Sequence, residues 1–187
     1  SITLHEFAHA ATASYLGDPT PREAGRVSIN PLVHLDPLGM LMIIFGPIGW
    51  ARPVPVNPNY LGRWGNLLVA AAGPLTNLFL AALAMLVLKH QAELISLTNW
   101  PINLFLPFQV ALGINLGLAI FNLLPIPPLD GSQILYSLLP PVMRPVFHHI
   151  LPYGVVILIA MVIFPFGGHL LSGILQIAEN GLFQLLP

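Results

Sequence analysis

The sequence predicts an all-α membrane protein, a polytopic bundle of transmembrane helices with a small region of loop and short strands between the first two helices. Of the 187 residues 56% are hydrophobic and only 7% are charged, and the mean hydropathy is +0.81. A soluble domain of this length carries about a quarter charged residues to cover its surface. The apolar residues also form long uncharged runs, preceded by a segment rich in Pro, Asn, Gly and charge.

Three of these runs are long enough to cross a bilayer, which takes roughly 20 residues. They are 66–88, 102–124 and 147–164. Residues 1–16 resemble the last part of a helix that ends at Gly17. Because the chain starts at Ser1 and reaches a charged motif within five residues, we expect the beginning of that helix to lie upstream. The tail 168–187 is apolar but contains Glu179, so a surface helix and a further span both stay open.

The segment 18–65 reads as loop with two short strands. Residues 25–30 alternate as a strand does, and 51–56 form a second strand interrupted by Pro53 and Pro55. Residues 38–50 are apolar but too short to span, which favours a re-entrant or interfacial segment. No repeat or linker divides the chain, so we expect a single domain over 1–187.

Charge and composition limit the kinds of partner and metal ligand that the chain can have. The net charge of −1, with no basic run, argues against nucleic acid. Without cysteine, any metal must be held by His, Asp or Glu. Antiparallel spans put all the arginines on one side and the single lysine, Lys89, on the other, which predicts a cytoplasmic arginine side. These arginines are Arg22, Arg26, Arg52, Arg63 and Arg144. We expect a multi-pass protein of a prokaryotic plasma membrane, with its motifs toward the cytoplasm.

The first motif is HEFAH at positions 5–9. Residues four apart share a helix face, so His5 and His9 can bind one ion while Glu6 reaches a water on that ion. The pattern also arises by chance in ordinary helices. Ionisable side chains in an apolar helix are costly, however, and such residues usually serve function, so we favour a metal site.

A catalytic zinc normally has three protein ligands. Asp130 and Glu179 are the acidic residues in the last third of the chain, and Asp130 follows the second span within NLLPIPPLDG at 122–131. It is a candidate third ligand, although Pro-Pro-Leu-Asp-Gly is also good turn chemistry.

Together the two motifs resemble those of the site-2 protease family, intramembrane zinc metalloproteases of peptidase family M50, with their HExxH and NxxPxxxLDG patterns. GPLTN at 73–77 is similar to the family's GPxxN, and NPLVHLDP lies at 30–37. No segment is long enough for the PDZ insertion of some members, so the resemblance is to the short, minimal subgroup.

The resemblance implies one Zn²⁺ per chain held by His5, His9 and Asp130, with Glu6 as general base toward a zinc-activated water. Asn122 resembles the family residue that orients substrate or stabilises the oxyanion; its alternative role is to cap the end of the span. The implied substrate is a transmembrane protein, cut in or near its membrane segment. An exposed strand at 26–30 could receive the unwound substrate by strand addition. The oligomeric state and the identity of the substrate stay open.

Other residues are weaker candidates for the functional site. His34 and Asp36 could support or bind the metal, or simply form loop turns. His148 and His149 are adjacent and cannot face one ion from a helix, which favours an interfacial position. Gly73 and Asn77 fit close helix packing, and Trp50 and Trp64 fit interface anchors.

Two alternatives come from other classes. A polytopic metal-ion transporter or binding protein would use the same His and Asp residues as ligands, but it has no evident use for Glu6. An inactive relative that acts as a membrane binding module would not need the intact HExxH and LDG motifs.

Overall fold

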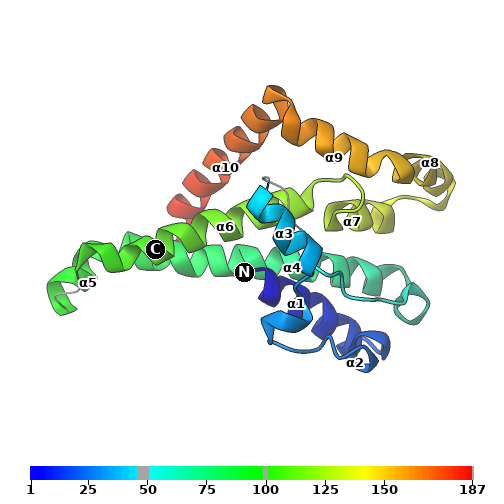
Figure 1. Cartoon of the computed structure of the whole chain (residues 1–187), viewed down its shortest axis with the longest axis horizontal. Coiled ribbons are helices and arrows are strands. Elements are labelled where there is room, and N and C mark those ends of the chain that lie inside the picture. The colour runs from blue at the N-terminus through cyan, green and yellow to red at the C-terminus, as the bar shows by residue number, and fades with distance from the viewer. Residues whose placement is uncertain (46–50, 99–100, 187) are drawn as a thin grey trace.

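A computed structural model of the chain describes residues 1–45, 51–98 and 101–186, and Figure 1 shows the arrangement of its helices. The α-helices are α1 (Ile2–Tyr15), α2 (Thr20–Glu23), α3 (Pro37–Phe45), α4 (Pro58–Lys89), α5 (Gln91–Thr98), α6 (Leu106–Leu123), α7 (Asp130–Leu138), α8 (Arg144–Ile150), α9 (Gly154–Ile163) and α10 (Pro165–Leu185). Short 3-10 turns lie at Pro31–Val33, Ile102–Phe105, Pro141–Met143 and Leu151–Tyr153.

Three helical stretches are long and apolar enough to cross a membrane. They are Pro58–Lys89, Asn103–Leu123 and Pro141–Ile163, and they contain the greater part of the runs predicted at 66–88, 102–124 and 147–164. Their outer faces are apolar: Val155, Val156 and Ile163 in the third stretch are 54%, 65% and 68% exposed. Such faces are suited to contact with lipid, so the described residues form an all-helical structure with three candidate membrane-spanning helices.

The helix α4 lies at the centre of the molecule and packs against α1, α6 and α7 (Figure 1). Its contact with α6 buries Ala81, Ala84 and Met85 against Leu112 and Leu116. The two alanines let the helix backbones approach closely, which is how helices associate without a hydrophobic driving force.

The tail forms α10, which turns back after α9 and packs its C-terminal half against the α4–α6 pair (Figure 1). Lys89 holds this end, because its Nζ donates to the carbonyl oxygens of Phe183 at 3.2 Å and Leu186 at 2.5 Å. Among the described residues, α10 is not one of the helices apolar enough to span.

The predicted strands are wrong. Residues 25–30 form a turn and irregular backbone, because Gly25 takes a left-handed φ of 66° and the buried Arg26 side chain donates to the carbonyl of Val33. Within 51–56 only Ala51 pairs, in an isolated antiparallel bridge with Leu35. Pro53 and Pro55 lack the N–H groups that would extend a ladder. The described residues hold no strand edge at 26–30 for a substrate to join.

The apolar segment predicted at 38–50 begins as α3, whose start is capped by Asp36: its Oδ1 accepts from the amides of Leu38 and Gly39, both at 2.9 Å. Residues 46–50, including the predicted anchor Trp50, lie outside the described residues. Trp64 is 65% exposed, as an anchor requires.

Candidate metal centre

The two histidines of the first motif lie one turn apart on α1, on the face that packs against α4. Both are buried, with exposed fractions of 6% for His5 and 8% for His9. The spacing of four residues brings both imidazoles to one place, as predicted. Their rings meet edge to face with centroids 4.7 Å apart.

Asp130 reaches the same place from the other half of the chain, because it is the first residue of α7 and α7 packs against α4. The loop before it is fixed by Ser132, whose hydroxyl donates to the carbonyl of Leu129 at 2.7 Å. Gly131 permits the close approach: a Cβ there would lie 2.2 Å from the carbonyl oxygen of Leu123 at the end of α6. The glycine of the LDG pattern therefore lets the aspartate sit against the end of the span.

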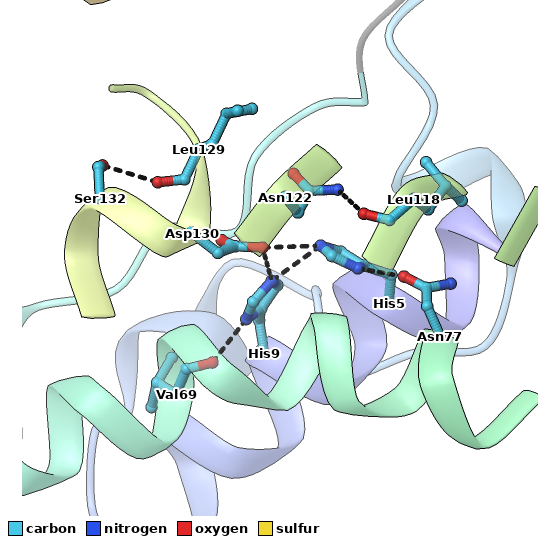
Figure 2. A network of polar contacts seen from close by, with 9 residues as sticks. All are labelled: His5, His9, Val69, Asn77, Leu118, Asn122, Leu129, Asp130 and Ser132. Atoms are coloured by element: carbon cyan, nitrogen blue, oxygen red, sulfur yellow. Dashed lines mark hydrogen bonds and ion pairs between the residues drawn. The ribbon is translucent and has the colours of Figure 1, made fainter. Parts of the chain in front are cut away.

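The three side chains converge on one point (Figure 2). The Nε2 atoms of His5 and His9 are 3.1 Å apart, and Asp130 Oδ2 lies 3.1 Å from the first and 3.3 Å from the second. Ligands at zinc-type bond lengths of about 2.0–2.2 Å in tetrahedral array are roughly 3.3 Å apart. Within the described residues, these are the His, Asp and Glu side chains placed to hold one metal ion.

The hydrogen bonds on the far side of each ring show which nitrogen carries the proton. His9 Nδ1 lies 2.7 Å from the carbonyl oxygen of Val69, which can only accept, so Nδ1 donates. For His5 the chain of bonds is longer. Asn115 Nδ2 donates to the carbonyl of Ala111 at 2.7 Å, so Asn115 Oδ1 accepts from Asn77 Nδ2 at 2.9 Å. Asn77 Oδ1 then accepts from His5 Nδ1 at 2.6 Å.

A neutral imidazole whose proton is on Nδ1 presents a lone pair at Nε2. Two lone pairs at 3.1 Å and a carboxylate oxygen beside them repel one another unless a cation or an added proton lies between them. Asp130 Oδ2 is buried and has no hydrogen bond of acceptable geometry among the described residues. The donor set, its tautomers and its unsatisfied oxygen therefore fit a metal ion such as zinc.

The space beside the histidines is kept open by Gly73 of α4. A Cβ at this position would lie 2.4 Å from His9 Nε2 and 2.6 Å from His5 Nε2. We predicted that Gly73 and Asn77 serve close helix packing, with Asn77 as a polar link between helices. Both are buried on α4: Gly73 lies against the two histidines of α1, and Asn77 bonds to His5 of α1 and to Asn115 of α6.

A cavity of about 500 Å³ adjoins the cluster. Glu6 and Asn122 line it together with the three candidate ligands, and so does the extended segment with Ala51, Pro53, Val54 and Val56. Within the described parts of the chain, the Glu6 carboxylate has no hydrogen bond or ion pair. One N–H of the Asn122 amide is used within α6, donating to the carbonyl of Leu118 at 2.9 Å (Figure 2). The structure thus brings every predicted site residue to one cavity.

The other polar candidates do not join the cluster. His34 is fully buried, and its Nε2 donates to the carbonyl of Ser28 at 2.6 Å, while Asp36 caps α3. His148 and His149 lie exposed on α8.

Sequence reasoning missed Asn115 and the carbonyl of Val69. Asn115 is a polar residue in the middle of an apolar run, and polar residues within membrane helices tend to face the bundle interior and to have partners there. That signal could have singled it out. A backbone carbonyl leaves no trace in the sequence.

Comparisons with known proteins agree with this geometry. The profile of Peptidase family M50 matches residues 89–165. Two similar proteins are each named "Putative zinc metalloprotease". YwhC of Bacillus subtilis is 38% identical over 99% of this chain and 86% of its own length. Rip2 of Mycobacterium tuberculosis is 35% identical over 78% of this chain and 55% of its own length. No solved structure matches the chain.

Proposed function

The chain belongs to peptidase family M50, and from this membership we propose that it is an intramembrane zinc metalloprotease that hydrolyses a peptide bond in or near a transmembrane segment of a membrane protein. The observation that carries the proposal is the convergence of His5, His9 and Asp130 beside a cavity that Glu6 also lines.

In this proposal His5, His9 and Asp130 hold one zinc ion. When bound there, zinc acts as a Lewis acid that polarises the scissile carbonyl and makes a water nucleophilic at neutral pH. These three side chains would supply the ligands of a catalytic zinc site, and the cavity that they line would admit water and substrate.

Glu6 is the proposed general base. It sits next to His5 on α1, lines the cavity, and has no competing hydrogen bond among the described residues. Its carboxylate accepts the proton of the attacking water and returns it to the leaving amine, which balances the hydrolysis.

Asn122 is the proposed oxyanion donor. It lines the same cavity from α6, and an amide has two N–H groups, of which the bond to Leu118 uses one. The remaining N–H can donate to the oxygen that becomes negative when the carbonyl is attacked.

Cleavage of a transmembrane peptide by the purified chain in lipid vesicles tests the proposal. Asp130→Ala should lose both zinc and cleavage, because it leaves two protein ligands. Asn122→Ala should keep zinc while the rate falls by about 10² to 10³. Full cleavage by Asp130→Ala, or no cleavage of any membrane peptide by zinc-loaded wild type, would contradict it.

A further inference from the structure

A second pocket, of about 380 Å³, lies between the start of α4, α7 and α8. Polar residues from all three helices line it, among them Arg63, Asn66, Gln133, Tyr136, Arg144 and His148. Its apolar wall includes Pro58, Phe147 and Leu151. In Figure 1 this is the end of the bundle marked by α8, away from α5, which follows Lys89.

The positive charge of this pocket is not neutralised. Two arginines line it and no carboxylate does. Across the described ranges, neither Arg63 nor Arg144 has an ion pair. In a chain with only six Lys and Arg residues, two of them share this one pocket.

The two arginines are held differently. Arg63 donates to the carbonyl oxygens of Ser137 and Leu138, so it already caps the end of α7. Arg144 lies with its guanidinium carbon 5.4 Å from the centre of the Tyr136 ring, and its Nε is buried without a hydrogen-bond partner in the described residues. A guanidinium held by an aromatic face with unused donors matches a phosphate or carboxylate group.

The surroundings of the pocket indicate which anion it takes. Val146 and Ile150 on α8 are 62% and 44% exposed, and Trp64 beside Arg63 is 65% exposed. Aliphatic chains and an aromatic ring beside a basic pocket are typical of the level of lipid headgroups. A free phosphate ion could pair with the same arginines, but it has no acyl chains to contact the exposed apolar residues around the pocket.

We propose that this pocket binds the phosphate group of an anionic phospholipid, with Arg144 and Arg63 as its charge partners and His148 at its edge. The acyl chains then lie along the exposed apolar faces of α8 and α9. The proposal does not depend on the hydrolytic reaction, although α7, which forms one wall, begins with the candidate metal ligand Asp130.

Native mass spectrometry of the purified chain in detergent micelles, titrated with phosphatidylglycerol or phosphatidylcholine, tests the proposal. Wild type should bind phosphatidylglycerol more tightly than phosphatidylcholine. Arg144→Gln should weaken phosphatidylglycerol binding about fivefold, since one basic residue near anionic lipid contributes roughly 1 kcal/mol. A large molar excess of inorganic phosphate should displace little of the lipid.

Two matched variants on α8 test the proposal with Arg144 unchanged, so the result does not depend on whether the Arg144 variant folds. His148→Glu puts a negative charge into the lining and should weaken phosphatidylglycerol binding about as much as Arg144→Gln does. His149→Glu makes the same change one residue away, outside the lining, and should bind as wild type does. Equal loss in the two glutamate variants, equal binding of the two lipids, or full displacement by inorganic phosphate would overturn the assignment.

Discussion

The proton position on each imidazole decides what the cluster of His5, His9 and Asp130 can bind. Both Nδ1 atoms donate to acceptors on α4, and both Nε2 atoms face Asp130, where a neutral ring offers a lone pair. The carbonyl of Val69 and the side chain of Asn77 thus orient the two histidines as ligands of the proposed metal ion. Such outer partners commonly contribute 10- to 100-fold to metal affinity, as an order of magnitude.

Gly73→Ala tests whether the space beside the histidines is needed. Its methyl carbon would lie 2.4 Å from His9 Nε2, closer than van der Waals contact allows, so the imidazoles must move apart. We expect zinc content, measured by elemental analysis of the purified chain, to fall by about tenfold or more.

Gly117→Ala is the matched control, since it also adds a methyl group to a helix glycine but meets nothing within 4 Å. It should bind zinc as wild type does. Normal zinc content in Gly73→Ala would show that the histidines do not need this space.

The bonds from His5 through Asn77 to Asn115 predict a graded effect. Asn77→Ala should lower zinc affinity about 10- to 100-fold, because the His5 ring loses the acceptor that fixes its tautomer. Asn115→Ala should have a smaller effect in the same direction, because it only orients Asn77. Competition with a zinc chelator measures both, with the exposed Asn180→Ala as control. An affinity for Asn115→Ala equal to that of Asn180→Ala would remove Asn115 from the network.

At the scale of elements, the fold was predictable where a pattern is local. The three predicted apolar runs lie within helices, and the four-residue spacing in HEFAH places His5 and His9 side by side. The prediction of strands at 25–30 and 51–56 was wrong because a short alternation of apolar and polar residues is weak evidence for a strand. The backbone conformation there is set by Gly25 and by the prolines at 53 and 55. The bond between Asn77 and Asn115 spans 38 residues, so no local pattern could have revealed it.

The junction between α1 and α4 depends on Asp18, which is fully buried. Its carboxylate accepts from the amide of Thr20 at 3.0 Å and from the amide of Asn57, just before α4, at 2.7 Å. Burial alone would raise the pKa of this carboxyl, but the hydrogen bonds from Thr20 and Asn57 outweigh it and the pKa is lowered.

A lowered pKa in the folded state means that ionised Asp18 stabilises the fold above its ordinary pKa of about 3.9, and that this stabilisation is lost as pH falls through the lower folded value. Asp18→Asn should therefore lower the free energy of unfolding by about 1–3 kcal/mol relative to wild type at neutral pH. Thermal unfolding in detergent at neutral and strongly acidic pH measures the difference, which should shrink in acid. An equal difference at both pH values would contradict the conclusion that the ionised Asp18 carboxylate stabilises the fold.

For the whole molecule, the distribution of basic residues predicts one orientation. Arg63 and Arg144 line one pocket, and Lys89 lies at the other end of α4. The positive-inside rule then predicts that the arginine end is cytoplasmic. Cysteines placed singly at Arg22, Arg63 and Arg144 should react with an impermeant reagent from the cytoplasmic side, and a cysteine at Lys89 from the opposite side. Labelling of Arg63 and Arg144 positions from opposite sides would contradict this topology.

We propose that the cluster of His5, His9 and Asp130 serves hydrolysis and does not merely hold or carry a metal. Glu6→Gln separates the two, because the amide keeps the shape of the side chain but accepts no proton. The most direct measurement is zinc content and cleavage of a vesicle-embedded transmembrane peptide in the same preparation of this variant. We predict zinc as in wild type and cleavage lower by about 10² to 10⁴. Near-normal cleavage by zinc-loaded Glu6→Gln would contradict the mechanism and favour a metal transporter.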